Sequence, residues 1–144
     1  MEYMEAALIE ARLAFDEHEV PVGAVVVHEG RIIAQARNKK EQNHDLTAHA
    51  EILALREAGK ALGKTNLKDC QIYITLEPCP MCLSAIIQAN IRTLCFGAYD
   101  RTMGAVESYM KIKEFPDGNR IEVVGGILEK ECGSLLQDFF RTLR

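Results

Sequence analysis

Two short motifs contain the residue types and spacing that could do chemistry: His49-Ala50-Glu51 and Pro78-Cys79-Pro80-Met81-Cys82. Cys79 and Cys82 are three residues apart at a predicted helix start, so their sulfur atoms can share one face of that helix. A helix N-terminus also favours thiolates through its dipole and its free N–H groups. Because His49 also lies at a predicted helix start, two helix N-termini could converge on one cation.

The number of candidate ligands favours a catalytic metal site. A structural zinc site uses four protein ligands, whereas a catalytic site uses three and leaves one position for water. His49, Cys79 and Cys82 make three, and Zn²⁺ bound there would lower the pKa of its water to roughly 7. Glu51 is close enough in sequence to accept the water proton without ligating the metal. We predict one Zn²⁺ per chain, with Glu51 as the catalytic proton shuttle.

Two other interpretations of these residues stay open. The Cys-x-x-Cys pair could be redox-active, although the upstream His-x-Glu motif disfavours this. The site could instead be structural if a fourth ligand came from Cys70, Cys95, His44 or another histidine.

Hydrophobic periodicity predicts the elements that position these motifs. The spacing predicts helices over about residues 2–18, 48–61, 80–90 and 128–142. It predicts strands over 22–27, 31–37, 71–75, 93–96 and 121–124. Thr47 is the expected cap of the second helix. The continuous β-branched run at 22–27 is typical of a strand buried on both faces.

The order of these elements predicts an α/β fold. The first two strands form a hairpin, and the strand–helix units that follow place helices on both faces of a central sheet. We therefore expect a three-layer α-β-α sandwich with a mixed five-stranded sheet. No repeat or linker divides the chain, so residues 1–144 are predicted to form a single domain.

Composition excludes several classes of protein. Of the 144 residues, 48% are hydrophobic and 26% charged, and no stretch approaches the ~20 apolar residues of a membrane span. The first five residues include two glutamates and no basic residue, and lack the features of a signal peptide. We expect a cytoplasmic protein without a membrane partner, in which the five cysteines stay reduced.

The distribution of charge qualifies the net charge of −4. Residues 1–30 carry −6, so the rest of the chain carries +2. Arg37, Lys39 and Lys40 cluster near the second strand, and Arg141 lies near the C-terminus. This distribution is compatible with a basic rim that contacts nucleic acid, and equally with an ordinary solvated surface.

The combination of His-x-Glu with Pro-Cys-x-x-Cys resembles the signature of the zinc-dependent nucleobase deaminases. Flanking segments are similar to the bacterial tRNA-specific adenosine deaminases within that superfamily: Glu19–Val25, Arg37–Asn38, Ala48–Ile52, Thr75–Cys79 and Asp138–Arg141. The resemblance implies a cytidine-deaminase-like fold, a tRNA anticodon stem-loop as partner and a homodimer. It implies hydrolytic deamination of adenosine to inosine at the wobble position, with His49, Cys79 and Cys82 as zinc ligands and Glu51 as proton shuttle.

The resemblance also assigns substrate contacts by position. Asn38 would read the flipped purine with an amide that both donates and accepts, and the Ala50 backbone N–H would face the base edge. Val20 would form an apolar pocket wall and Asp100 would lie near the sugar. Phe140, with Phe139, would offer an aromatic face to the splayed bases.

Each of these contacts has a plainer alternative. Asn38 and Asp100 could be turn residues, Val20 could belong to the core, and helical spacing favours core packing for at least one of the two phenylalanines. Glu77 is expected either to form hydrogen bonds behind the metal ligands or to be a surface carboxylate. The apolar residues of the third helix could be core or interface: Leu83, Ile86 and Ile87.

Two segments differ from the usual family pattern. Glu107 stands where a small residue is typical, and Asp117–Arg120 lacks a histidine that often follows the asparagine.

The alternative function is a deaminase of a free base or nucleotide, of guanine or cytosine type, with the same zinc chemistry. A third possibility is a non-catalytic binding module that zinc stabilises.

Overall fold

The computed structural model of the chain describes residues 2–143, which form a five-stranded sheet with four α-helices and two short 3₁₀ helices. The helices are α1 (Glu2–Asp16), α2 (Ala50–Leu62), α3 (Pro80–Gln88), α4 (Glu129–Thr142), η1 (Ile112–Glu114) and η2 (Gly118–Arg120). The strands are β1 (Gly23–His28), β2 (Arg31–Arg37), β3 (Cys70–Leu76), β4 (Thr93–Ala98) and β5 (Glu122–Val124).

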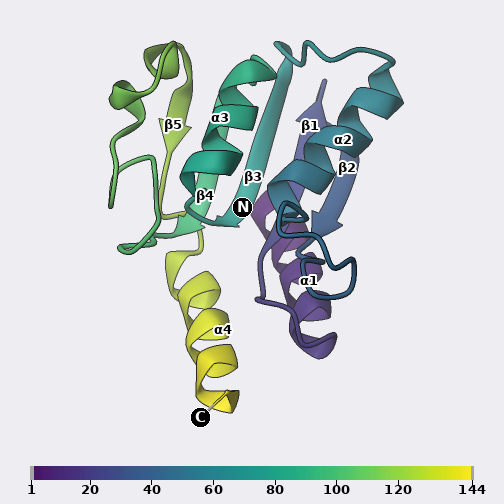
Figure 1. Cartoon of the computed structure of the whole chain (residues 1–144). Coiled ribbons are helices and arrows are strands. Elements are labelled where there is room, and N and C mark those ends of the chain that lie inside the picture. Colours follow the sequence, from purple (N-terminus) through teal and green to yellow (C-terminus); the bar gives the residue numbers. More distant parts are fainter. Residues whose placement is uncertain (1, 144) are drawn as a thin grey trace.

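The sheet is mixed, as the sequence predicted, with the strand order β2-β1-β3-β4-β5. β1 is antiparallel to both β2 and β3, whereas β3–β4 and β4–β5 are parallel pairs. Helices α2 and α3 cover one face of the sheet, and α1 and α4 lie on the other (Figure 1). The three-layer α-β-α architecture is therefore confirmed.

Alternation along the central strands builds the two cores. Ala24 and Val26 of β1 pack with α2 and α3, and Val25 and Val27 point to the opposite face against α1. Gly23 lets α1 approach closely, because a Cβ atom there would lie 2.0 Å from the carbonyl oxygen of Ala7. Within residues 2–143, no helix is long and apolar enough to cross a membrane.

The element boundaries differ from the predicted ones mainly at helix ends. Helix α2 begins at Ala50 with His49 as its N-cap, so the prediction of Thr47 as the cap was wrong. The N–H and hydroxyl of Thr47 instead donate to Asp45 Oδ1, at 2.9 and 2.7 Å. The predicted first helix also extended too far, since α1 ends at Asp16 and His18 has a φ of 63°.

Candidate active site

The direction of the strands brings the candidate residues to one edge of the sheet. β2, β3 and β4 all run the same way, because β1 is antiparallel to both β2 and β3. Asn38 follows β2, Cys79 follows β3 by three residues, and Asp100 follows β4 by two. Helices α2 and α3 start at this same edge, the lower one in Figure 1. The carboxyl edge of a sheet with parallel strands is the usual place for a ligand site.

His49, Cys79 and Cys82 lie together at this edge. Their ligating atoms are all within 4.8 Å of one another, with His49 Nδ1 3.8 Å from Cys79 Sγ and 3.3 Å from Cys82 Sγ. His49 is the N-cap of α2 and Cys79 the N-cap of α3, so two helix N-termini converge as the sequence predicted. Both ends favour negative charge on the sulfur atoms.

Hydrogen bonds and burial shift the pKa values of all three candidate ligands. A hydrogen bond from Cys82, aided by His49, lowers the pKa of Cys79 to about 4. Donating that bond raises the pKa of Cys82, and its burial raises it further. The contact with Cys79 also raises the pKa of His49. The set therefore holds one thiolate beside a second sulfur that resists ionisation until a cation offsets the charge.

Glu51 lies in the first turn of α2, next to this group, with 5% of its surface exposed. Burial raises the pKa of its carboxyl to about 7, and the negative charge of Cys79 raises it as well. A carboxyl group in this range can both accept and release a proton at neutral pH. The site thus combines a three-ligand set with an adjacent acid–base group.

Comparison with known proteins identifies the family. The family model of the MafB19-like deaminases matches residues 1–144. The tRNA-specific adenosine deaminase of Bacillus subtilis (strain 168) is 45% identical over 143 residues, which cover 99% of this chain and 89% of that protein. The chain belongs to this deaminase family.

Two further matches agree with that assignment. A solved structure from a study of A-to-I editing by tRNA:A34 deaminases at the wobble position is 45% identical to this chain, with a TM-score of 0.90. It covers 94% of this chain and 99% of its own. The chloroplastic tRNA(adenine(34)) deaminase of Arabidopsis thaliana is 42% identical over 156 residues, and the match spans 96% of this chain but 12% of that much longer protein.

Two of the residues assigned to substrate binding, Asn38 and Ala50, lie on or next to the segment that carries His49. Asn38 is buried, and the neighbouring Lys39 N–H donates to the Ala48 carbonyl at 3.0 Å, which joins this segment to the one carrying His49. Ala50 is the first residue of α2, where a backbone N–H has no partner within the helix. Val20 is half-buried and packs against the core with its inner surface.

Asp100 of the deaminase shapes a turn. Its Oδ1 accepts hydrogen bonds from the Thr102 N–H, the Thr102 hydroxyl and the Met103 N–H, at 2.9–3.2 Å. The turn role considered from the sequence is therefore present in the structure. Glu107, in the same loop, is exposed and donates its backbone N–H to Glu77.

The two aromatic residues of α4 separate into different roles. Phe139 is buried and packs edge-on against Phe15 of α1, with ring centroids 5.7 Å apart. Phe140 is 47% exposed, so the core packing expected for at least one of the two phenylalanines applies to Phe139. The Phe140 ring is available to a ligand while Phe139 anchors the helix.

The basic residues that the sequence offered for a rim also differ in their environments. Arg37 forms ion pairs with Glu10 and Glu17, at 3.0 and 2.8 Å, and so belongs to the structure rather than to a rim. Lys39 is half-buried and Lys40 is exposed. Arg141 is 72% exposed and pairs with Asp138 at 3.2 Å.

Sequence reasoning missed one buried acidic group near the site. Glu19 is 1% exposed and accepts hydrogen bonds from the backbone N–H groups of Glu41 and Gln42, at 3.1 and 2.8 Å. No sequence pattern signals this, because the donors are more than twenty residues away.

The apolar residues of α3 that could be core or interface are all buried within the single chain, which assigns them to the core: Leu83, Ile86 and Ile87.

Proposed function

We propose that the protein catalyses hydrolytic deamination of adenosine to inosine at the wobble position of a tRNA anticodon. The observation that carries this proposal is the convergence of His49, Cys79 and Cys82 beside buried Glu51 in a chain 45% identical to a tRNA-specific adenosine deaminase. The overall reaction consumes adenosine and water and yields inosine and ammonia.

The donor set fits zinc. Bond lengths of about 2.3 Å to sulfur and 2.0–2.1 Å to nitrogen place tetrahedral ligand atoms about 3.5–3.8 Å apart. The two nitrogen–sulfur separations of 3.3 and 3.8 Å lie on either side of the nitrogen–sulfur value of this geometry, so shifts of a few tenths of an ångström would complete it. When bound, Zn²⁺ supplies Lewis acidity that turns water into a nucleophile near neutral pH. His49, Cys79 and Cys82 would hold it.

Glu51 then performs the proton transfers. Its carboxylate accepts a proton as water adds to C6 of the adenine and delivers it to the ring nitrogen beside that carbon. Glu51 then takes the proton of the hydroxyl now on C6 and delivers it to the exocyclic amine, so that the C6–N bond breaks, the C6 carbonyl forms and ammonia leaves. One carboxyl group can serve both transfers only if it lies beside the attacked carbon, and Glu51 lies next to the ligand group where that carbon would bind.

The surrounding residues would bind the flipped nucleotide. The Asn38 amide would read the purine, the Ala50 N–H would face the base edge, and Val20 would form an apolar wall. Asp100 would lie near the sugar. The exposed ring of Phe140 would stack on a neighbouring anticodon base, since unpaired bases are commonly recognised by aromatic faces.

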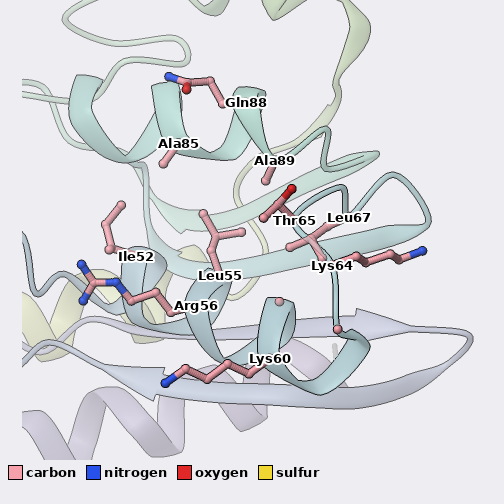
Figure 2. Close-up of a pocket in the computed structure, with 12 residues that line it drawn as sticks. Ile52, Leu55, Arg56, Lys60, Lys64, Thr65, Leu67, Ala85, Gln88 and Ala89 are labelled. Atoms are coloured by element: carbon pink, nitrogen blue, oxygen red, sulfur yellow. The ribbon is translucent and has the colours of Figure 1, made fainter.

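We also propose a homodimer, formed through the groove between α2 and α3. This groove has a volume of about 750 Å³, and Leu55 of α2 faces Ala85 and Ala89 of α3 across it (Figure 2). The resemblance to the family supports a second copy of this chain as its occupant. Size-exclusion chromatography with light scattering tests this, and a mass of one chain only would contradict it.

The free thiols of the ligand pair support a cytoplasmic location, because a reducing compartment keeps Cys79 and Cys82 available for metal. Cell fractionation with an antibody to the protein tests this part of the proposal.

A substrate panel tests the proposed activity and its alternatives together. The purified protein is analysed for metal and assayed for ammonia release from an anticodon stem-loop, guanine and cytidine, with inosine quantified after digestion of the RNA. We expect zinc and inosine formation from the stem-loop. Turnover of guanine or cytidine without turnover of RNA would indicate a free-base deaminase, and zinc without any turnover would indicate a binding module.

A further inference from the structure

A buried carboxylate without a role in the proposed reaction lies directly before the cysteine motif. Glu77 follows β3 and is 1% exposed. The sequence left open whether this residue forms hydrogen bonds behind the candidate metal ligands or lies at the surface. Its burial excludes the surface position. Its partners all belong to the loop of residues 100–108, which follows β4.

Both oxygen atoms of Glu77 are fully engaged by this loop. Oε2 accepts the backbone N–H groups of Val106, Glu107 and Ser108, at 3.0, 2.7 and 3.0 Å. Oε1 accepts the Asp100 N–H at 3.0 Å and the Ser108 hydroxyl. Successive N–H groups that point inward form a cradle for an anion, and here the protein itself supplies the anion.

The loop is also shaped to fit this carboxylate. A Cβ atom on Gly104 would lie 2.4 Å from the Glu77 carboxyl group and 2.4 Å from the Asp100 carbonyl oxygen, so only glycine fits between them. The Ala105 N–H donates to the Pro78 carbonyl at 2.8 Å, one residue before Cys79. A backbone hydrogen bond thus connects the loop to the segment that carries a candidate metal ligand.

We propose that Glu77 is a positioning residue that holds the 100–108 loop, and with it Asp100, in the conformation that receives the nucleotide. Without this carboxylate, the four backbone N–H groups lose their acceptor and the loop must be ordered anew at each binding event. Glu77 acts through the loop and touches no reacting atom. The inference rests on the proposed function, since the nucleotide is the ligand that the loop would receive.

Glu77→Gln tests this with little change in shape, because the amide keeps one acceptor and turns the other toward N–H groups as a donor. We expect KM for the anticodon stem-loop to rise about tenfold, the equivalent of one lost hydrogen bond, with kcat changed by less than about threefold. Zinc content should equal that of the parent. Amide hydrogen exchange of Val106, Glu107 and Ser108 should accelerate about tenfold or more in the zinc-loaded protein.

Two further variants make the test specific. Ser108→Ala removes only the hydroxyl donor and should raise KM about threefold, which decides the question if Glu77→Gln does not fold. Glu19→Gln makes the same change at another buried carboxylate that accepts backbone N–H groups, and should leave exchange at 106–108 unchanged.

Several outcomes would overturn the inference. Unchanged exchange at 106–108 would show that Glu77 does not hold the loop, and loss of zinc would place it in the metal site. A fall in kcat at constant KM would make it a catalytic group. If instead the parent fails to deaminate the stem-loop, the proposed function fails, while the exchange measurement still reports on the loop.

Discussion

Under the proposed function, substitution of Glu51 distinguishes catalysis from metal binding. Glu51 lies beside the ligand group and contributes no ligand atom to it. Glu51→Gln should therefore retain zinc but lose at least about 10²–10⁴-fold in kcat, the usual cost of removing a general acid–base group. Stem-loop turnover and metal analysis on the same preparation check this.

A ligand substitution provides the matched control for Glu51. Cys79→Ala should lower zinc content and thermal stability together, because metal binding and folding are coupled when the ligands come from separate elements. Normal zinc and substantial turnover in Glu51→Gln would contradict its role as proton shuttle.

The positions of the candidate ligands at two helix starts could be predicted from the sequence, whereas the hydrogen-bond partners of Glu19 and Glu77 could not. His49 and the cysteine pair each start a helix, and local patterns mark helix starts well. The environments of Glu19 and Glu77 depend on donors 22–31 residues away in the chain. Asp100 shows a related limit, since its identity suits a turn and a ligand contact equally well.

At the scale of elements, an ion-pair network ties α1 to the end of β2. Arg37 donates Nε and its second terminal nitrogen to the two oxygens of Glu17, at 2.8 and 2.9 Å, and its first terminal nitrogen to Glu10 at 3.0 Å. Hydrogen bonds from Arg37 and Gln42 hold the pKa of Glu17 at about 2 in the folded protein, below its ordinary 4.5. The segment that leads into Asn38 is thereby fixed against α1.

This network predicts a pH-dependent contribution to stability. Because the folded-state pKa of Glu17 is lowered, its stabilising effect is present above about pH 4.5 and is lost as pH falls toward about 2. Glu17→Gln should therefore lower Tm clearly at pH 6 and less at pH 3. Thermal unfolding of parent and variant at both pH values measures the two differences.

Glu5 offers the control for this prediction. It is exposed on the same helix and forms no salt bridge within residues 2–143. The Tm difference between the parent and Glu5→Gln should therefore be similar at pH 6 and pH 3. An equal Tm difference for Glu17→Gln at pH 6 and pH 3 would mean that the ion pair is not what stabilises this junction.

The shift of the α2 start from Thr47 to His49 shows where element boundaries escape local rules. Thr47 has the right side chain for a cap, but its hydroxyl is bound to Asp45. His49 forms no side-chain capping bond, and its ring is directed instead to the two cysteines. The helix start and the candidate ligand are therefore the same residue, which a rule based on capping side chains does not predict.

On the scale of the whole molecule, the sequence predicted the layers better than the connections at the site edge. The continuous apolar run of β1 correctly indicated a strand buried on both faces, and β1 does lie between β2 and β3. The 99–121 segment lacks such periodicity, and its two 3₁₀ turns, η1 and η2, were not predicted. Its conformation depends on contacts with Glu77 and Pro78, which no local pattern encodes.

Basic side chains at and beyond the site edge are expected to contact the phosphates of the RNA. Lys39 and Lys40 lie at the site edge, and Arg141 lies on α4, which extends beyond that edge (Figure 1). Each contact between a basic side chain and the phosphate of a single strand contributes about 0.7 to the salt slope of log affinity, so three contribute about 2. The Lys39→Ala/Lys40→Ala/Arg141→Ala variant should show a higher KM for the stem-loop and a salt slope flatter by that amount, with kcat less affected.

A matched control separates position from net charge. Arg31, Lys68 and Arg92 are exposed and lie at or just before the amino ends of β2, β3 and β4, at the opposite edge of the sheet. Replacing these three by alanine makes the same change in net charge, but should leave the salt slope close to that of the parent. Raising salt from about 50 to 200 mM should then inhibit the parent and this control about twentyfold more than the site-edge variant. Equal slopes in all three proteins would contradict the placement of RNA at the carboxyl edge, because only a substrate bound there distinguishes the two sets of charges.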